Sequence, residues 1–256
     1  ICNSIAEFKA IRQDIHQHPE LAFKELRTSA LIADYMRSYG YQIDSGIAKT
    51  GIVATLQKGT SLKSIGIRAD MDALPIHEET GLTYASQKSG VMHACGHDGH
   101  VTIALAAAKA LAIDGRFDGT VRFIFQPAEE IGQGAQAMIK EDLFTRFPVA
   151  AVYALHNWPD LPVGKIAVVK GAAMASVDFF KVKIKGKGSH GAEPQNGIDP
   201  ITIAAYLITS LQTIVSRNIN PQEMGVVTVG SIQGGNAANV IPDEVELKLT
   251  LRAYSA

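Results

Sequence analysis

The chain opens with two stretches in which apolar residues recur at the spacing of an amphipathic helix. In residues 4–18, Phe8, Ile11 and Ile15 share one face, and Ser4 is in position to cap the helix. The second stretch, residues 24–39, is followed by a glycine, which commonly ends a helix. The first 40 residues therefore predict two helices in succession.

Short apolar runs of strand length then alternate with helical patterns. The predicted strands cover residues 51–57, 64–69, 121–126 and 151–155, and the predicted helices cover residues 101–113 and 134–140. This alternation is typical of an α/β fold with a mainly parallel sheet covered by helices. In such sheets, ligands bind beyond the carboxyl ends of the strands.

The pattern changes near Gly171. Strands are predicted over residues 177–185, 225–232 and 244–253, with a loop over 186–200 and a helix over 201–216. This order predicts a second, smaller α+β domain. We therefore expect one domain over residues 1–172 and another over residues 173–256.

The composition fits a globular protein and narrows its partners. The 256 residues are 46% hydrophobic and 19% charged, and 24 basic against 25 acidic residues give a net charge of −1. This balance argues against nucleic-acid binding, which needs a basic face. We interpret the alternating lysines of residues 181–187 as the solvent face of a strand.

No apolar run suggests a membrane span, and no signal peptide is expected. The two cysteines, Cys2 and Cys95, do not indicate a disulfide framework, so we expect a reduced, cytoplasmic protein.

The most informative motif runs from His93 to His100 and places a thiol, three imidazoles and a carboxylate within eight residues. Such side chains bind zinc and similar divalent metals. Cys95 and His97 can reach one centre from a loop, and a thiolate can bridge two metals. Taken alone, His93 or His100 is more often a structural residue, or a hydrogen-bond partner of a metal ligand, than a ligand itself. Asp98 could cap the following helix.

Acidic residues and a histidine follow three of the predicted strands. In chain order these residues are Asp70 and Asp72, then Glu129 and Glu130, then His156. Because the carboxyl ends of parallel strands meet at one edge of a sheet, we expect these side chains to gather there with the cysteine and histidines of the motif. The sequence therefore predicts a metal site at this edge.

The two adjacent glutamates are expected to divide two roles between them. Successive side chains diverge, so we assign Glu130 as a ligand and Glu129 as the general base for a water polarised by metal. His156 supplies a nitrogen ligand, and Asp72 is a candidate for orienting a ligand histidine through its other ring nitrogen. Each of these residues also has an ordinary explanation that needs no metal. Paired acidic residues are common at helix starts, a lone histidine often lies in a loop, and a lone cysteine such as Cys95 is usually a buried thiol. Their joint occurrence at strand ends favours the metal site.

Four motifs, in order over nearly the whole chain, resemble those of the M20 metallopeptidase family: Arg68-Ala-Asp70-Met-Asp72-Ala-Leu-Pro75, the His93–His100 segment, Gln126-Pro-Ala-Glu129-Glu130 and Leu155-His156-Asn157-Trp158-Pro159. They look most like the amidohydrolase branch, which includes N-acyl-amino-acid, hippurate and plant auxin-conjugate hydrolases. The resemblance implies a phosphorylase/hydrolase-like zinc-peptidase domain, followed by a lid or dimerisation domain. It also implies Glu129 as the base and four metal ligands: Cys95, His97, Glu130 and His156.

The resemblance extends to three residues of the second domain. His190 resembles a histidine that reaches into the partner subunit's site and steadies the oxyanion, which implies a homodimer joined through the lid. Asn239 and Arg252 resemble groups that hold the substrate's carbonyl or carboxylate. Without the resemblance, His190 and Asn239 could be turn residues, and Arg252 could be a solvated strand residue.

One feature departs from the family. In members of the M20 family, the chain returns to the catalytic domain after the lid and supplies the last metal-binding histidine there. In this sequence, no histidine follows His190. We therefore expect a C-terminally truncated chain.

The sequence predicts an enzyme that cleaves the amide bond of small N-acyl amino acids to a carboxylate and a free amino acid. Its cofactor would be a divalent metal, two per site in the complete protein, with zinc, manganese, cobalt and nickel all suited to the ligands. A metallo-carboxypeptidase or deacetylase of peptide-like substrates is the alternative enzyme. A non-catalytic homologue that binds metal or ligand is the alternative outside enzymes.

Overall fold

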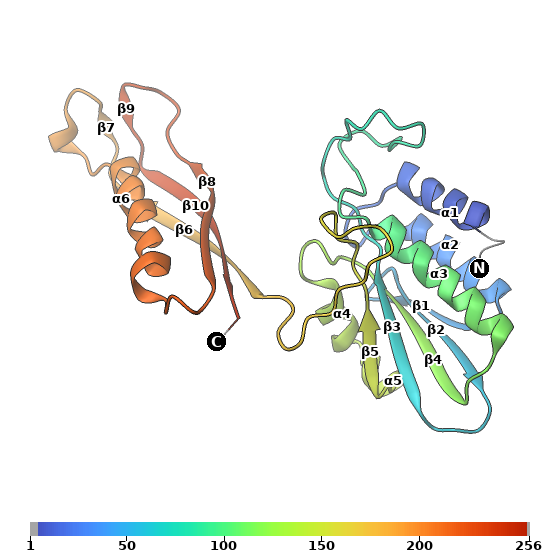
Figure 1. Ribbon diagram of the computed structural model, residues 1–256. Helices are drawn as coiled ribbons and strands as arrows, with labels where there is room; N and C mark the ends of the chain where they lie inside the picture. Colours follow the sequence, from blue (N-terminus) through green and yellow to red (C-terminus); the bar gives the residue numbers. More distant parts are fainter. Residues whose placement is uncertain (1–4, 255–256) are drawn as a thin grey trace. The chain divides into compact units, whose positions relative to one another are not determined.

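The computed structural model describes residues 5–254, so Cys2 and the predicted cap Ser4 lie outside the described residues. The chain forms two compact units that divide between residues 160 and 161 (Figure 1). Residues 161–172 have no regular secondary structure, and the expected domain border after residue 172 stays a prediction. Within residues 5–254, no helix combines the length and apolarity needed to cross a membrane.

Unit 1, up to residue 160, is built on a five-stranded sheet in the order β1-β2-β4-β3-β5. β3 pairs in parallel with β4 and β5, while β2 is antiparallel to both β1 and β4. Four of the five strands therefore run in one direction, which agrees with the prediction of a mainly parallel sheet. The strands are β1 (Gln42–Ile47), β2 (Gly51–Lys58), β3 (Ser64–Asp70), β4 (Gly119–Gln126) and β5 (Ala151–Ala154).

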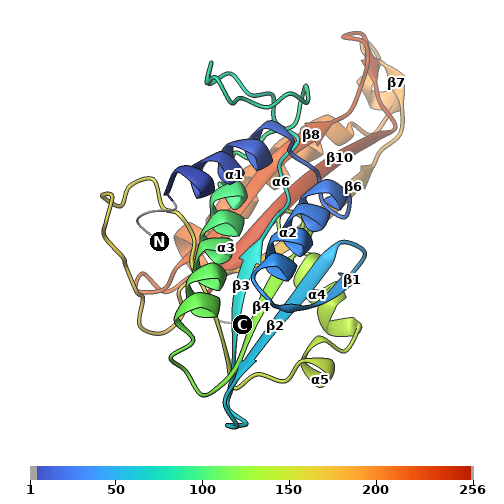
Figure 2. The same ribbon diagram turned by 90° about the vertical axis from the view of Figure 1, so that its right-hand side faces the viewer.

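Helices cover both faces of this sheet. Figure 2 shows three of them side by side in front of it: α1 (Ile5–Gln17), α2 (Leu26–Ser38) and α3 (His97–Asp114). The short helices α4 (Gly134–Lys140) and α5 (Leu143–Arg146) pack against the other face. Both faces need covering because successive side chains of a strand point to opposite faces. In β4, Phe123 and Phe125 enter the core under the long helices, whereas Ile124 enters the core on the opposite side.

Several elements differ from the predictions, and α3 and β1 show why. α3 begins at His97, four residues before the predicted start, because Gly96 adopts a φ of 89° that turns the chain into the helix. The first turn is polar but buried, so the apolar period that begins at Val101 did not reveal it. β1 was not predicted because its polar, partly exposed sequence lacks a clear alternation.

Unit 2 combines an antiparallel sheet in the order β6-β10-β8 with one long helix, matching the α+β pattern predicted for this part. The helix packs on one face of the sheet over Val245, Leu247 and Leu249. Asp199 caps this helix by accepting the backbone N–H groups of residues 201 and 202. The elements are β6 (Ser176–Lys185), β7 (Ser189–His190), a 3-10 turn (Pro194–Asn196), α6 (Pro200–Thr213), a π-helical turn (Ile214–Asn218), β8 (Gly225–Gln233), β9 (Val240–Ile241) and β10 (Glu244–Ala253).

Candidate metal centre

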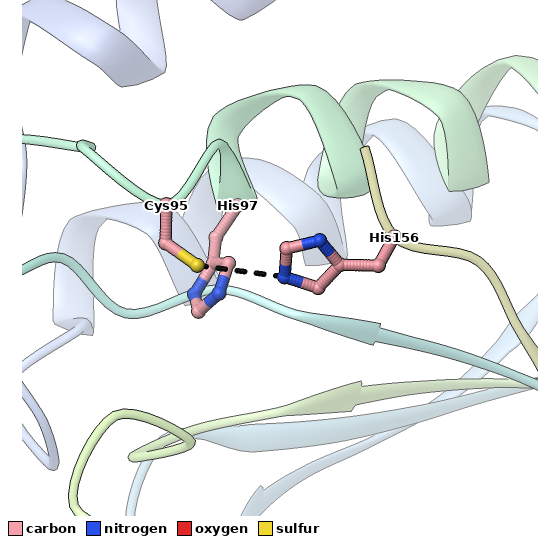
Figure 3. A group of neighbouring side chains, drawn as sticks. All are labelled: Cys95, His97 and His156. Atoms are coloured by element: carbon pink, nitrogen blue, oxygen red, sulfur yellow. Dashed lines mark hydrogen bonds between the residues drawn. The ribbon is translucent and has the colours of Figure 1, made fainter. Parts of the chain in front are cut away.

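Three of the four predicted ligands point toward one another beyond the carboxyl ends of the parallel strands (Figure 3). Cys95, His97 and His156 each offer one ligand atom, and these atoms all lie within 4.8 Å of one another. Sγ of Cys95 is 3.4 Å from Nε2 of His156. The thiol comes from the loop before α3, the first imidazole from the start of α3, and the second from the segment after β5.

The two glutamates join this group through the same histidine. Oε1 of Glu130 is 3.8 Å and Oε2 of Glu129 is 3.9 Å from Nε2 of His97. His97, Glu129 and Glu130 thus form a second group of potential ligands that shares His97 with the first. The structure therefore brings together all four predicted ligands and the predicted base.

The orientation of the imidazoles fits a divalent metal. Nδ1 of His97 is 2.8 Å from the carbonyl oxygen of Asp72, and Nδ1 of His156 is 2.7 Å from that of Asn157. A proton on each Nδ1 leaves each Nε2 lone pair directed at the cluster, which is the usual arrangement of histidine ligands. Nε2 of His97 and Oε1 of Glu130 are buried and have no hydrogen-bond partner among the described residues. A cation at this point would satisfy both atoms.

Asp72 lies beneath the cluster, but it contacts the histidine differently from the prediction. The carbonyl of Asp72, and not its carboxylate, makes the short contact with His97, since Oδ1 is 3.4 Å away from Nδ1. The carboxylate instead accepts the backbone N–H groups of Glu129 (3.0 Å) and Glu130 (3.1 Å). Asp72 thereby joins the histidine to the loop that carries both glutamates.

A second buried carboxylate, missed by sequence analysis, fixes the same loop. Oε1 of Glu25 accepts the backbone N–H of Ala128 (2.9 Å), and Oε2 accepts the hydroxyl of Thr50 (2.6 Å). Ala128 has a φ of 50°, a conformation that residues with a Cβ rarely adopt. Glu25 thus holds a strained backbone directly before Glu129. An acidic residue at the start of a predicted helix gave no signal of this role, because such residues are common there.

Burial and crowding of acidic groups shape the electrostatics of the site. Burial raises the pKa of the Cys95 thiol to about 12, and the nearby Glu130 carboxylate adds to this rise. Burial also raises the pKa of Glu130. Burial alone would raise the pKa of Asp70 as well, but a hydrogen bond from His100 and the neighbouring His97 and Arg68 hold it at about 2. A divalent cation would offset the repulsion among these groups and favour the thiolate.

Of the remaining polar residues of the His93–His100 segment, His100 forms a third group of potential ligands with His97 and Asp70, whereas Asp98 and His93 lie outside the cluster. Asp98 is not the helix cap, which is Gly96; its Oδ2 lies 3.0 Å from Nε of Arg12 and from Nδ1 of His16. His93 is buried, and neither of its ring nitrogens has a hydrogen-bond partner among the described residues.

The three candidates in unit 2 lie at two different sheets, His190 and Asn239 at the two-stranded sheet β7-β9 and Arg252 in the three-stranded sheet β6-β10-β8. His190 and Asn239 are neighbours, because β7 pairs with β9 and the N–H of Gly191 donates to the carbonyl of Asn239 (2.8 Å). Arg252 pairs with Val177 at the opposite end of β10. The eight residues that separate Arg252 from the start of β10 correspond to roughly 26 Å of strand. All three side chains belong to exposed residues.

Comparisons with known proteins agree with this geometry. A model of peptidase family M20/M25/M40 matches residues 66–254. A hippurate hydrolase of Campylobacter jejuni is 49% identical over 96% of this chain and 64% of its own length. An N-acetyl-L-cysteine deacetylase of Bacillus subtilis is 47% identical over 96% of this chain and 59% of its own length.

A solved structure extends the comparison. A dinuclear metal-binding peptidase of the M20 family from Bacillus subtilis superimposes with a TM-score of 0.78 at 40% identity, over 98% of this chain and 64% of that one. The chain spans about 60% of the length of the curated relatives described above. With the family model matching most of the sequence and the ligand groups assembled at the sheet edge, the chain belongs to peptidase family M20/M25/M40.

Proposed function

We propose that this protein is a metal-dependent amidohydrolase that releases free amino acids from N-acyl amino acids. The observation that carries the proposal is the position of Glu129, beside the ligand cluster but on a side chain that is 37% exposed, whereas Glu130 is 17% exposed with a buried, unpartnered Oε1. A group that accepts a proton from water needs access to water, and a ligand does not. Relatives named hippurate hydrolase and N-acetyl-L-cysteine deacetylase support an N-acyl amino acid as substrate.

Each residue of the cluster has a part in this proposal. Cys95, His97, Glu130 and His156 would hold divalent metal, with two ions per site in the complete protein; zinc, manganese, cobalt and nickel all suit these donors. Bound metal supplies Lewis acidity that polarises an amide carbonyl and acidifies water. Glu129 accepts the proton of the attacking water and can return it to the departing amine.

The second unit is proposed as the lid and dimerisation domain, with residues 1–172 forming the catalytic part and residues 173–256 the lid. Nδ1 of His190 accepts the N–H of Ala192 (3.1 Å), so its proton lies on Nε2, which can donate to an oxyanion. Arg252 lies where β6 begins and its fork suits a substrate carboxylate. Asn239, beside His190, suits the substrate's carbonyl.

The proposal includes a homodimer, because His190 resembles a histidine that acts in the site of a partner subunit. Arg252 is at the end of the sheet that joins the connecting segment, whereas His190 is beyond the far end of the ten-residue strands β6 and β10. Cys95, as a free thiol, suits the reducing cytoplasm that we also propose.

The test is a substrate panel assayed after removal of metal and reloading with each of the four metals. N-acetyl, N-benzoyl and longer N-acyl amino acids are compared with dipeptides of the same amino acids, and the released amino acid is measured. We expect hydrolysis only with metal, and faster for the N-acyl compounds. Release from dipeptides alone would indicate a peptidase, and metal binding without turnover of any compound would indicate a non-catalytic binding protein.

A further inference from the structure

His100 lies next to the metal cluster, yet both of its ring nitrogens are directed elsewhere. The side chain is 2% exposed. Nδ1 is 2.6 Å from Oδ1 of Asp70, and Nε2 is 2.6 Å from Oδ1 of Asn157. The backbone N–H of Asn157 donates to Nε2 at 3.0 Å, which places the ring proton on Nδ1, toward the carboxylate of Asp70. His100 thus connects the end of β3 to the segment that follows β5.

Asn157 transmits this connection to a metal ligand. It directly follows His156, and its carbonyl oxygen holds Nδ1 of that ring at 2.7 Å. The side chain of Asn157 meets His100, while its backbone carbonyl sets the rotation of the His156 ring. Nε2 of His156 is thereby directed at Cys95.

The conformation of Gly96 makes room for this arrangement. A Cβ atom at Gly96 would lie 2.5 Å from Oδ1 of Asn157, and the φ of 89° also disfavours any other residue. The glycine between Cys95 and His97 therefore lets the amide of Asn157 pack against the turn that carries both ligands.

The other end of the connection is firmly anchored. Asp70 is 1% exposed, and its Oδ2 lies 2.8 Å from Nη1 of Arg68. Nε of Arg68 donates to the side-chain oxygen of Gln126 at the end of β4 (2.9 Å). His100 is thus fixed to two strands of the central sheet, whereas His156 is exposed and follows a strand of only four residues.

We propose that Asn157 and His100 are positioning residues that hold His156 in place to receive metal; the inference rests on the ligand set of the proposed function. The exposed segment after β5 would otherwise let the His156 ring leave the cluster. Hydrogen-bond partners behind metal ligands typically contribute 10–100-fold to metal affinity. His100 itself stays outside the ligand set because each of its nitrogens already faces a partner at 2.6 Å.

The test is a double-mutant cycle on Co²⁺ affinity with the variants Asn157→Ala, His156→Ala and their combination. Asn157 is exposed, so its truncation should leave the fold intact, which a thermal melt checks; Asn236→Ala, an exposed asparagine of unit 2, is the matched control. Co²⁺ also reports ligation, because a Cys95 thiolate gives a charge-transfer band. We expect Asn157→Ala to weaken binding ~10–100-fold, to keep the thiolate band, and to cause no further loss in the His156→Ala background.

Wild-type affinity in Asn157→Ala, or an equal loss with and without His156, overturns the positioning role. Wild-type affinity in His156→Ala overturns both this inference and the ligand set. If the cycle behaves as expected but no N-acyl amino acid is hydrolysed, the positioning role stands and the proposed function fails.

Discussion

The candidate residues of the two units are held in very different ways. In unit 1, His97 is fully buried, and contacts to Asp72 hold the ring of His97 and the backbone of Glu129. In unit 2, His190 and Arg252 belong to exposed residues, and the ring of His190 accepts a hydrogen bond from the backbone N–H of Ala192. The difference indicates that contacts within unit 1 hold the candidate metal ligands in place, whereas the candidate residues of unit 2 are exposed to solvent.

The largest effect should come from removing a ligand in unit 1. Cys95→Ser replaces a thiolate with a poor ligand at a half-buried position, so the fold should persist while metal affinity drops by more than the ~10–100-fold typical of an outer hydrogen bond. Isothermal titration with Zn²⁺ measures this. Arg252→Ala is the matched variant in unit 2 and should keep wild-type affinity; a similar loss in both variants would contradict the separation of roles between the units.

Removing the proposed oxyanion donor of unit 2 should affect turnover and leave metal content unchanged. His190→Ala should lower kcat by ~10²–10³-fold, with a smaller change in KM, because the bond strengthens in the transition state. Mixing differentially tagged His190→Ala and Glu129→Gln subunits should restore part of the activity, since one site of a mixed dimer keeps both groups. Mixed dimers as inactive as either parent would rule out a role across subunits.

Stability should respond to the buried carboxylate under the glutamate loop. Glu25→Ala leaves the N–H of Ala128 buried without a partner, which should lower the free energy of unfolding by ~1–3 kcal/mol in urea titrations. Glu25→Gln keeps an oxygen for that N–H and should lose much less. Equal stability of Glu25→Ala and the wild type would show that Glu25 does not hold the loop.

The smallest effect is a pH dependence of stability from His16. The hydrogen bond to Asp98 raises the pKa of His16 above 6.5, against burial, with Glu78 adding to the rise; Tyr84 and His93 are the other titratable rings that face it. Because the folded state holds this proton more tightly, the stabilisation is complete below pH 6.5 and is lost as the pH rises through the folded pKa. One proton limits the slope to about 1.4 kcal/mol per pH unit.

Urea titrations from pH 6 to 9 measure this slope. His16→Asn should remove its contribution, so that the stability of the variant falls less steeply than that of the wild type. Parallel curves for the two proteins would show that His16 does not carry the proton difference.

The positions of the metal ligands could be predicted because strand ends are visible in sequence. The apolar runs ending near Ala69, Gln126 and Leu155 placed the neighbouring polar residues at one sheet edge, and the ligand groups formed there. The supports of the site could not be predicted in the same way. Glu25 is 103 residues from Ala128, and His100 is 57 residues from Asn157, so these contacts depend on tertiary packing that no local pattern encodes.

The start of α3 shows a second limit of sequence patterns. Helical periodicity is detected through apolar residues, whereas the first turn of α3 buries His97, Asp98 and His100 in place of apolar side chains. When polar functional residues occupy the buried face of a helix, the apolar pattern that would predict the helix is missing.

The most direct test of the account compares two neighbouring substitutions, Glu129→Gln and Glu130→Gln, by metal content and by turnover of an N-acyl amino acid in the same preparations. Glu129→Gln should retain wild-type metal content and lose ~10²–10⁴-fold in kcat, since an amide cannot accept the proton of water. Glu130→Gln should lose metal. If Glu129→Gln loses metal while its metal-loaded fraction turns over normally, Glu129 is a ligand and not the base, and the assignment of the site is wrong.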